Sequence, residues 1–124
     1  MIIKNGHATI ENYWGEKLKY ITVFHSFKGL KDTTATFFNP GHGESEKDSL
    51  TFYYYTGVFS PQNYWGIRIR TMDDHMYSLM DTFYCSITES DHGKAIIGVN
   101  GVSQTVYINF PSSSGCSKKL IRIE

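Results

Sequence analysis

The fold class is visible first in residues 50–70, Leu50-Thr-Phe-Tyr-Tyr-Tyr-Thr-Gly-Val-Phe-Ser-Pro-Gln-Asn-Tyr-Trp-Gly-Ile-Arg-Ile-Arg70. This stretch holds seven aromatic rings, and a Gly/Ser/Pro/Gln/Asn segment divides it into two β-prone halves. In the second half apolar residues occupy every other position, which is the period of a half-buried strand. The pattern predicts a β-hairpin, with strands at residues 50–55 and 64–71 and rings on both of its faces.

The same two-residue period recurs along most of the chain. Residues 18–27, for example, place Ile21, Val23 and His25 on one face, and Tyr20, Thr22 and Phe24 on the other. The remaining expected strands are residues 33–38, 75–79, 95–99, 105–110 and 119–123, and residues 41–48 are expected to form an exposed loop.

Turn-forming residues separate these strands. Asn39-Pro40-Gly41 is a strong turn signal, and Asn100-Gly101 is the dipeptide favoured in type I′ hairpins. Eight or nine short strands with turns every 8–12 residues, and no convincing amphipathic helix, are typical of a sandwich or barrel. We therefore predict an all-β fold: one domain, residues 1–124, forming an antiparallel β-sandwich.

The charge balance limits the classes of partner. Twelve basic residues match twelve acidic ones, so the formal net charge is zero. Nucleic-acid binding by counterion release needs a basic surface, and we expect no such partner. A net charge near zero favours association into a homo-oligomer. No run of eighteen apolar residues occurs and no secretory h-region is visible, so we expect a cytoplasmic or non-classically exported protein.

Two cysteines, Cys85 and Cys116, lie 31 residues apart, each beside a strand end or a turn. A disulfide between them would fasten the last two hairpins to the preceding segment. Two buried thiols fit the sequence equally well, because spacing alone does not give the Cα separation that a disulfide requires.

Candidate catalytic groups are few. The five histidines show no recognised metal-ligand spacing, and the position of His25 on an apolar strand face predicts a hydrogen-bonded core residue. Ser90-Asp91-His92 contains the residue types of a triad, but triad members are normally brought together from distant positions. Asp91 with Gly93 fits a turn or cap better. We expect no enzymatic activity and no cofactor.

Acidic side chains gather in two expected loops. Calcium prefers several carboxylate oxygens in flexible loops, so a calcium site is one interpretation and solvated loop charge is the other. The candidates are Glu44, Glu46, Asp48, Asp73 and Asp74.

The aromatic residues are the main functional clue. Strands bury alternate residues, so about half of the rings should belong to the core. Rings near loops are expected to be exposed, and exposed tyrosine and tryptophan rings settle at lipid–water interfaces or stack on sugars. The loop-proximal rings are Tyr13, Trp14, Phe59 and Tyr64.

A series of short motifs runs through residues 7–120. It comprises Ile21-Thr-Val-Phe-His25, Asn39-Pro40-Gly41, Tyr55-Thr56-Gly57, Tyr64-Trp65-Gly66-Ile67, Thr88-x-x-Asp91 and Val106-x-Ile-x-Phe110-Pro-Ser-Ser-Ser-Gly-Cys116. Their order resembles a domain family named from nematode proteins up-regulated in long-lived insulin-signalling mutants, which also occurs in fungi and bacteria. That family is similar in architecture to the aegerolysins, fungal β-sandwich proteins that bind membrane lipids. The resemblance implies a lipid-recognising β-sandwich and transfers no catalytic residue.

The leading functional expectation is a non-enzymatic module that recognises a membrane lipid or the bilayer interface. The four loop-proximal rings would enter the interface, and Arg68 and Arg70 would pair with an anionic headgroup. An alternative is a lectin-like module in which the rings stack on pyranose faces while Gln62 and Asn63 supply hydrogen bonds. A third is a self-associating structural or defence protein with no small ligand.

Overall fold

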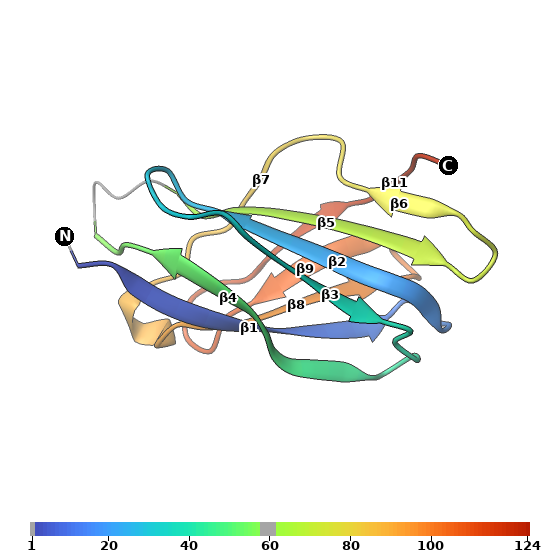
Figure 1. The fold of residues 1–124 in the computed structure, drawn as a ribbon, viewed down its shortest axis with the longest axis horizontal. Coiled ribbons are helices and arrows are strands. Elements are labelled where there is room, and N and C mark those ends of the chain that lie inside the picture. The colour runs from blue at the N-terminus through green and yellow to red at the C-terminus, as the bar shows by residue number, and fades with distance from the viewer. Residues whose placement is uncertain (1, 58–61) are drawn as a thin grey trace.

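The segments with a two-residue apolar period form β-strands, and these strands pack as two β-sheets (Figure 1). The computed structural model describes residues 2–57 and 62–124. Sheet A has the strand order β10-β9-β8-β1-β4. It is formed by β1 (Lys4–Tyr13), β4 (Ser45–Tyr54), β8 (Lys94–Asn100), β9 (Thr105–Asn109) and β10 (Cys116–Lys119).

Sheet B has the strand order β11-β6-β5-β2-β3, and β7 pairs with β5 beside this path. It is formed by β2 (Leu18–Ser26), β3 (Thr33–Phe38), β5 (Tyr64–Thr71), β6 (Met76–Ser78), β7 (Phe83–Tyr84) and β11 (Ile121–Arg122). One 3-10 turn, η1 (Glu89–Asp91), precedes β8. In Figure 1, β2, β3 and β5 cross in front of β8 and β9.

The predicted all-β sandwich is confirmed, with one difference in strand direction. Among residues 2–57 and 62–124, all strand pairs are antiparallel except β1 and β8, which run parallel from His7 opposite Lys94 to Tyr13 opposite Asn100. β1 and β8 enter sheet A from the same end, and local apolar periodicity carries no information about the relative direction of strands so far apart in sequence.

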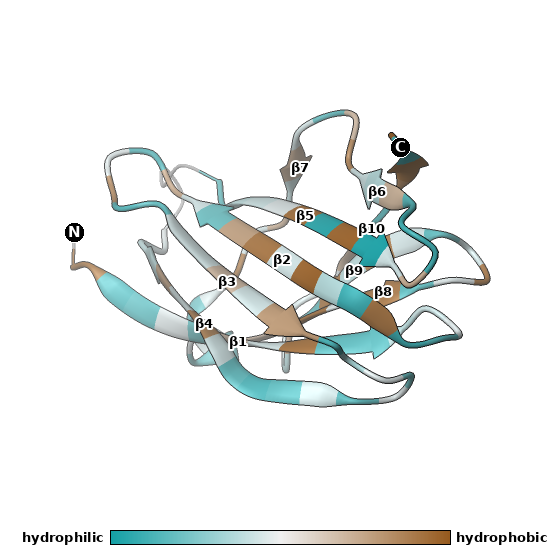
Figure 2. Ribbon diagram, turned by 45° about the vertical axis from the view of Figure 1, so that its right-hand side comes forward, coloured by the Kyte–Doolittle hydropathy of each residue, from teal (hydrophilic) through white to brown (hydrophobic). Residues whose placement is uncertain are grey.

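Apolar side chains from both sheets meet in one core. Figure 2 shows the alternation of hydrophobic and hydrophilic residues along β2. At one end of the core, the rings of His25, Phe52 and Trp65 contact one another, with centroid separations of 4.6 to 5.1 Å. The largest fully buried side chains also include Ile10, Leu18, Ile21, Phe27, Leu50, Ile69, Ile97, Ile108 and Leu120.

The predicted aromatic hairpin is wrong. β4 pairs with β1 in sheet A, whereas β5 pairs with β2 in sheet B, so the two strands face each other across the core. Phe52 and Tyr54 point inward from sheet A and Trp65 from sheet B. A period of two shows which residues are buried but not which strands pair.

Two turn regions also differ from expectation. β4 begins at Ser45, inside the predicted loop of residues 41–48. The β8–β9 hairpin is present, but Asn100 pairs with Thr105, and the intervening residue with positive φ is Gln104. The Asn100 side chain accepts hydrogen bonds from the Val102 and Ser103 amides, which favours a longer turn over type I′.

The structure contains a disulfide between Cys85 and Cys116, whose Cα atoms lie 6.0 Å apart. Cys85 follows β7 of sheet B, and Cys116 begins β10 of sheet A. The bridge therefore joins the two sheets covalently.

Candidate ligand surface on the outer face of sheet B

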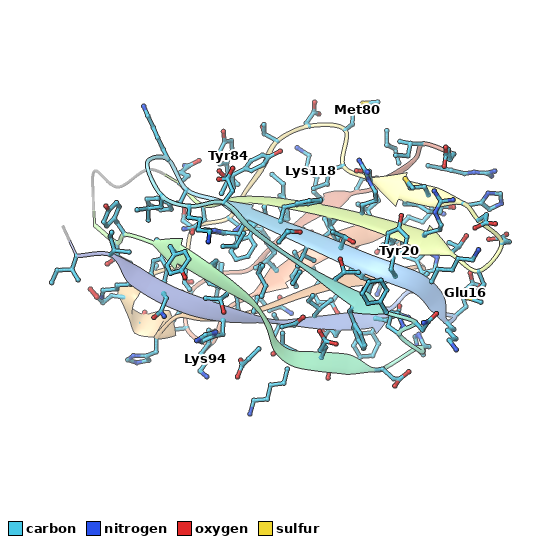
Figure 3. All side chains as sticks on the ribbon, in the orientation of Figure 1. Glu16, Tyr20, Met80, Tyr84, Lys94 and Lys118 are labelled. Atoms are coloured by element: carbon cyan, nitrogen blue, oxygen red, sulfur yellow. A yellow bond between two sulfur atoms is a disulfide. The ribbon has the colours of Figure 1, made fainter. Side chains whose placement is uncertain are left out.

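The outer face of sheet B carries several exposed rings. In β2 the inward residues Ile21, Val23 and His25 are buried, so the residues between them face outward. Phe24 is 40% exposed, Phe38 70% and Tyr84 52%. Figure 3 labels Tyr20 and Tyr84 on this face. Its other outward residues are Thr22, Ser26, Thr34, Thr36, Tyr64, Gly66, Arg68 and Arg70.

A hollow of about 370 Å³ lies on this face near the ends of β2 and β3. Its wall combines rings, hydroxyl groups and one carboxylate. A Cβ at position 66 would lie 3.2 Å from Phe24, so the Phe24 ring leans over Gly66. The lining residues are Phe24, His25, Ser26, Asp32, Thr33, Thr34, Tyr64 and Gly66.

Tyr64 borders two further hollows next to the first, of about 530 and 290 Å³. Its ring packs edge-on against Tyr84 with a centroid separation of 5.8 Å. Met80, which is 73% exposed and labelled in Figure 3, lines the smaller one. All three hollows are therefore bordered by the same tyrosine.

Beneath this surface, His25 and Asn63 form a buried polar pair. His25 Nε2 lies 2.7 Å from Asn63 Oδ1, and the two residues are 1% and 2% exposed. Burial lowers the pKa of His25, while the Asn63 hydrogen bond and the Asp32 charge oppose that shift. The prediction of a hydrogen-bonded core histidine is confirmed. Asn63 is not available as an exposed sugar ligand, which corrects one part of the lectin-like expectation.

The outer face of sheet A is built differently. Tyr107 lies over Gly98, and its hydroxyl donates to Glu11 Oε1 at 2.6 Å. Burial, followed by the Glu11 interaction, raises the pKa of Tyr107. A hollow of about 350 Å³ on this sheet is bordered by His7, Lys47, Asp48 and Lys94, with Ile96 and Asn109. Figure 3 labels Lys94 on this side of the molecule.

The loop-proximal rings do not form one cluster. Tyr13 ends β1 beside the start of β2, whereas Tyr64 pairs with Ser26 at the end of β2. The eight-residue rise from Leu18 to Ser26 corresponds to about 26 Å. Figure 3 places Glu16, in the β1–β2 turn, far along the long axis from Tyr84. The described rings therefore cannot enter one interface together.

The exposure of these rings also differs from expectation. Tyr13 is 44% exposed and meets the His42 ring edge-on. Trp14 is half-buried against the core and lies 4.8 Å from the Tyr77 ring, so its predicted exposure is wrong. Tyr64 is half-buried as well, and Phe59 lies outside the described residues.

The two arginines of β5 have different surroundings. Arg68 is exposed and lies opposite Thr22. Arg70 pairs with Glu124 at 3.1 Å and with Asp74 at 3.7 Å. The Arg70 guanidinium is therefore ion-paired within the protein. This differs from the expectation that it would bind an anionic headgroup.

The five acidic candidates are not brought together. Asp74 pairs with Lys19, which is the main cause of a lowered Asp74 pKa, and Asp73 accepts from the Thr71 hydroxyl. Glu44 accepts from the Gly41 amide and Glu46 from the Ser49 hydroxyl, while Asp48 is exposed. In residues 2–57 and 62–124, no three His, Cys, Asp or Glu side chains are arranged to hold a metal ion.

Asp91 is structural, as the sequence suggested. Its carboxylate is fully buried and accepts five hydrogen bonds: two from Thr88, two from Ser113 and one from Ser112. Burial alone would raise its pKa, but these donors outweigh that effect and lower the pKa to about 2. Asp91 thereby ties η1 to the segment after β9.

Several residues of the candidate surface were not singled out from the sequence. Phe24 carried a usable signal, because it shares the otherwise polar face of its strand with Thr22. Tyr84 carried none, since β7 has only two residues and no detectable period. Asp32 and Thr33 reach the edge of the hollow because β3 pairs with β2, which puts Thr33 opposite His25.

No protein-family model matches the chain, and no curated protein sequence is significantly similar to it. The resemblance to the nematode-named family accordingly stays a prediction. In the described part of the chain, no helix has the length and apolar character needed to cross a membrane.

Proposed function

We propose that this chain is a non-enzymatic binding module that holds a pyranose ring of a glycan on the outer face of sheet B. The observation that carries the proposal is the hollow of about 370 Å³ whose wall combines the rings of Phe24 and Tyr64 with hydroxyl and carboxylate groups. A pyranose matches such a wall because it has an apolar C–H face and hydroxyl groups around its edge.

The roles of the lining residues follow from their chemistry. Phe24 and Tyr64 provide ring faces or edges against which the C–H face packs. Ser26 offers a hydroxyl, and Asp32 offers a carboxylate that accepts hydrogen bonds from sugar hydroxyls. Tyr84, in contact with Tyr64, extends the platform toward a second sugar unit.

The lipid expectation has less support from the arrangement of residues. Of its proposed anchors, Tyr13 and Tyr64 lie at different ends of β2, Trp14 packs against the core, and Arg70 is paired with carboxylates. A bilayer contact would need several of them on one plane. Membrane binding is therefore a separate outcome of the test below.

The test is calorimetric titration of the protein with methyl glycosides of neutral hexopyranoses and with their short oligosaccharides. Removal of a stacking ring costs about 1 kcal/mol, which is about a fivefold loss of affinity. We expect losses of that size for Phe24→Ala and Tyr84→Ala. The matched control is Tyr13→Ala, because Tyr13 is 44% exposed, similar to Phe24 at 40%, but lies at the other end.

Two results would contradict the proposal. One is the absence of heat with every saccharide of the panel, and the other is an equal loss of affinity in Tyr13→Ala. Liposomes of phosphatidylcholine, anionic lipids, sphingolipid and sterol form the second arm, with and without calcium. Selective pelleting with one lipid class, unaffected by free glycoside, would replace the sugar by a lipid as ligand.

A further inference from the structure

Three outward residues at one end of sheet B form a row across neighbouring strands. Ser26 of β2 lies directly opposite Tyr64 of β5, and Tyr64 lies directly opposite Tyr84 of β7. The residue beside each of them in its strand is buried, so all three side chains face away from the core. Opposed Cβ atoms on adjacent strands lie about 5 Å apart, so the row is about 10 Å long.

A second hollow, of about 530 Å³, lies along this row. Ser26 and Tyr64 line both this hollow and the one of about 370 Å³, so the two hollows adjoin at these residues. Lys28, Gln62 and Tyr84 line the second hollow and not the first. A glycan held in the first hollow can therefore continue past Tyr64 into the second.

The two hollows carry opposite charges. Asp32 lines the first hollow, and Lys28 lines the second. Both side chains are exposed, and neither forms an ion pair within residues 2–57 and 62–124. The Lys28 ammonium is therefore free to pair with an anionic group of a ligand.

The opposite charges indicate what kind of glycan fits the surface. Resting on the function proposed above, we infer that the glycan carries an acidic second unit, whose carboxylate pairs with Lys28 while its ring packs against Tyr84. The unit in the first hollow is neutral, because the Asp32 carboxylate would repel a second negative charge there. The ligand class is thus a glycan in which a uronic acid adjoins a neutral hexose.

The test compares two matched disaccharides by calorimetric titration. One is a uronic acid linked to a neutral hexose, and the other is the same disaccharide with its carboxylate reduced to a primary alcohol. Because the Lys28 ion pair is exposed, we expect the acidic disaccharide to bind only about threefold more tightly than the reduced one. Raising the salt concentration should remove this preference by screening the pair.

Lys28→Gln should abolish the preference for the acidic disaccharide, since it removes the ammonium but keeps a hydrogen-bond donor. Affinity for the reduced disaccharide and the thermal midpoint should not change, because Lys28 is exposed. The matched control is Lys31→Gln: Lys31 is exposed in the same β2–β3 connection but lines neither hollow, so the preference should persist.

The possible failures are distinguishable. Equal affinity of the wild type for both disaccharides would overturn this inference and leave the proposed function intact. The same holds for a preference that Lys28→Gln retains or that Lys31→Gln also removes. A wild type that binds no saccharide, neutral or acidic, would overturn the proposed function, and this inference with it.

Discussion

Each sheet has a glycine directly opposite an aromatic residue on the neighbouring strand, but only in sheet A does the aromatic side chain form a hydrogen bond. In sheet A, Gly98 lies opposite Tyr107, whose hydroxyl is bonded to Glu11 at 2.6 Å. In sheet B, Gly66 lies opposite Phe24, which has no polar atom to anchor it and stays 40% exposed. The glycine in each pair gives the facing ring room to lie over the backbone.

The two rings differ in burial and in hydrogen bonding within the protein. Tyr107 is half-buried and has its hydrogen bond, so it has little to gain from a ligand. Phe24 borders a hollow with Tyr64, and its ring makes no polar contact there. The same cross-strand arrangement therefore gives a ring bonded within the protein on sheet A and an exposed ring beside a hollow on sheet B, where we propose that the ligand binds.

The largest expected effect comes from removing the bridge that joins the two sheets. Cys85→Ser with Cys116→Ser should lower the free energy of unfolding by about 3–4 kcal/mol, given the 31-residue separation of the cysteines. Urea unfolding followed by tryptophan fluorescence measures this loss. Both outer faces depend on the packed sandwich, so the double variant should destabilise them together. A loss below about 1 kcal/mol would show that packing alone holds the sheets.

Replacing Asp91 tests whether its buried, hydrogen-bonded carboxylate stabilises the folded protein near η1. Its folded pKa of about 2 lies below the ordinary aspartate value of 3.8, so its contribution is full above about pH 5 and is lost as pH falls toward 2. That contribution is about 2 kcal/mol. Asp91→Asn should therefore be destabilised at pH 7 and lose less stability than the wild type on acidification.

Urea unfolding at pH 7, 4 and 2.5 gives both quantities for Asp91→Asn. The control is Asp48→Asn, because Asp48 is exposed and its left-handed backbone, with φ of 52°, also suits asparagine. Equal acid sensitivity of the wild type and Asp91→Asn would contradict the assigned role.

Paired glycine substitutions sharpen the comparison between the faces most directly. An added Cβ at position 98 would lie 2.4 Å from the Tyr107 hydroxyl, whereas one at position 66 would lie 3.2 Å from Phe24. We expect Gly98→Ala to cost about 1–3 kcal/mol, since Tyr107 must move and lose its bond to Glu11. Gly66→Ala should cost less than about 1 kcal/mol and should reduce sugar affinity, because it moves the Phe24 ring. A reversed order of thermal midpoints would refute this reading of the two pairs.

The smallest effect concerns the hydroxyl that closes sheet A. Tyr107→Phe keeps the ring over Gly98 and removes the hydrogen bond to Glu11. The expected cost is about 1 kcal/mol, measurable as a modest fall in the thermal midpoint. Glycoside affinity should not change, and a change would mean that the two faces are coupled.

The sequence predicted which residues are buried better than it predicted which strands pair with each other. Alternation along residues 64–71 identified Trp65, Ile67 and Ile69 as core residues, and it placed His25 inward. It could not show that β4 and β5 belong to different sheets, because the partner of a strand depends on contacts distant in sequence. The parallel pairing of β1 and β8 escaped prediction for the same reason.

The candidate surface was harder to predict than the fold. Tyr64 was identified from its place beside a loop, but the residues near it on this face, Phe24, Thr34 and Tyr84, come from three separate strands. Their proximity depends on the register of sheet B, which places Phe24 opposite both Gly66 and Thr34. Selecting aromatic residues only because they lie near loops therefore grouped residues from both ends of the molecule into one predicted site.

The most direct test of the central claim is amide chemical-shift mapping of ¹⁵N-labelled protein titrated with the methyl hexopyranosides. The account predicts saturable shifts along the ends of β2, β3 and β5 and at β7, including Phe24, Thr34, Gly66 and Tyr84. The amides of Glu11 and Tyr107 on sheet A should stay in place. Shifts confined to sheet A or to the Tyr13 end, or no shifts with any glycoside, would contradict it.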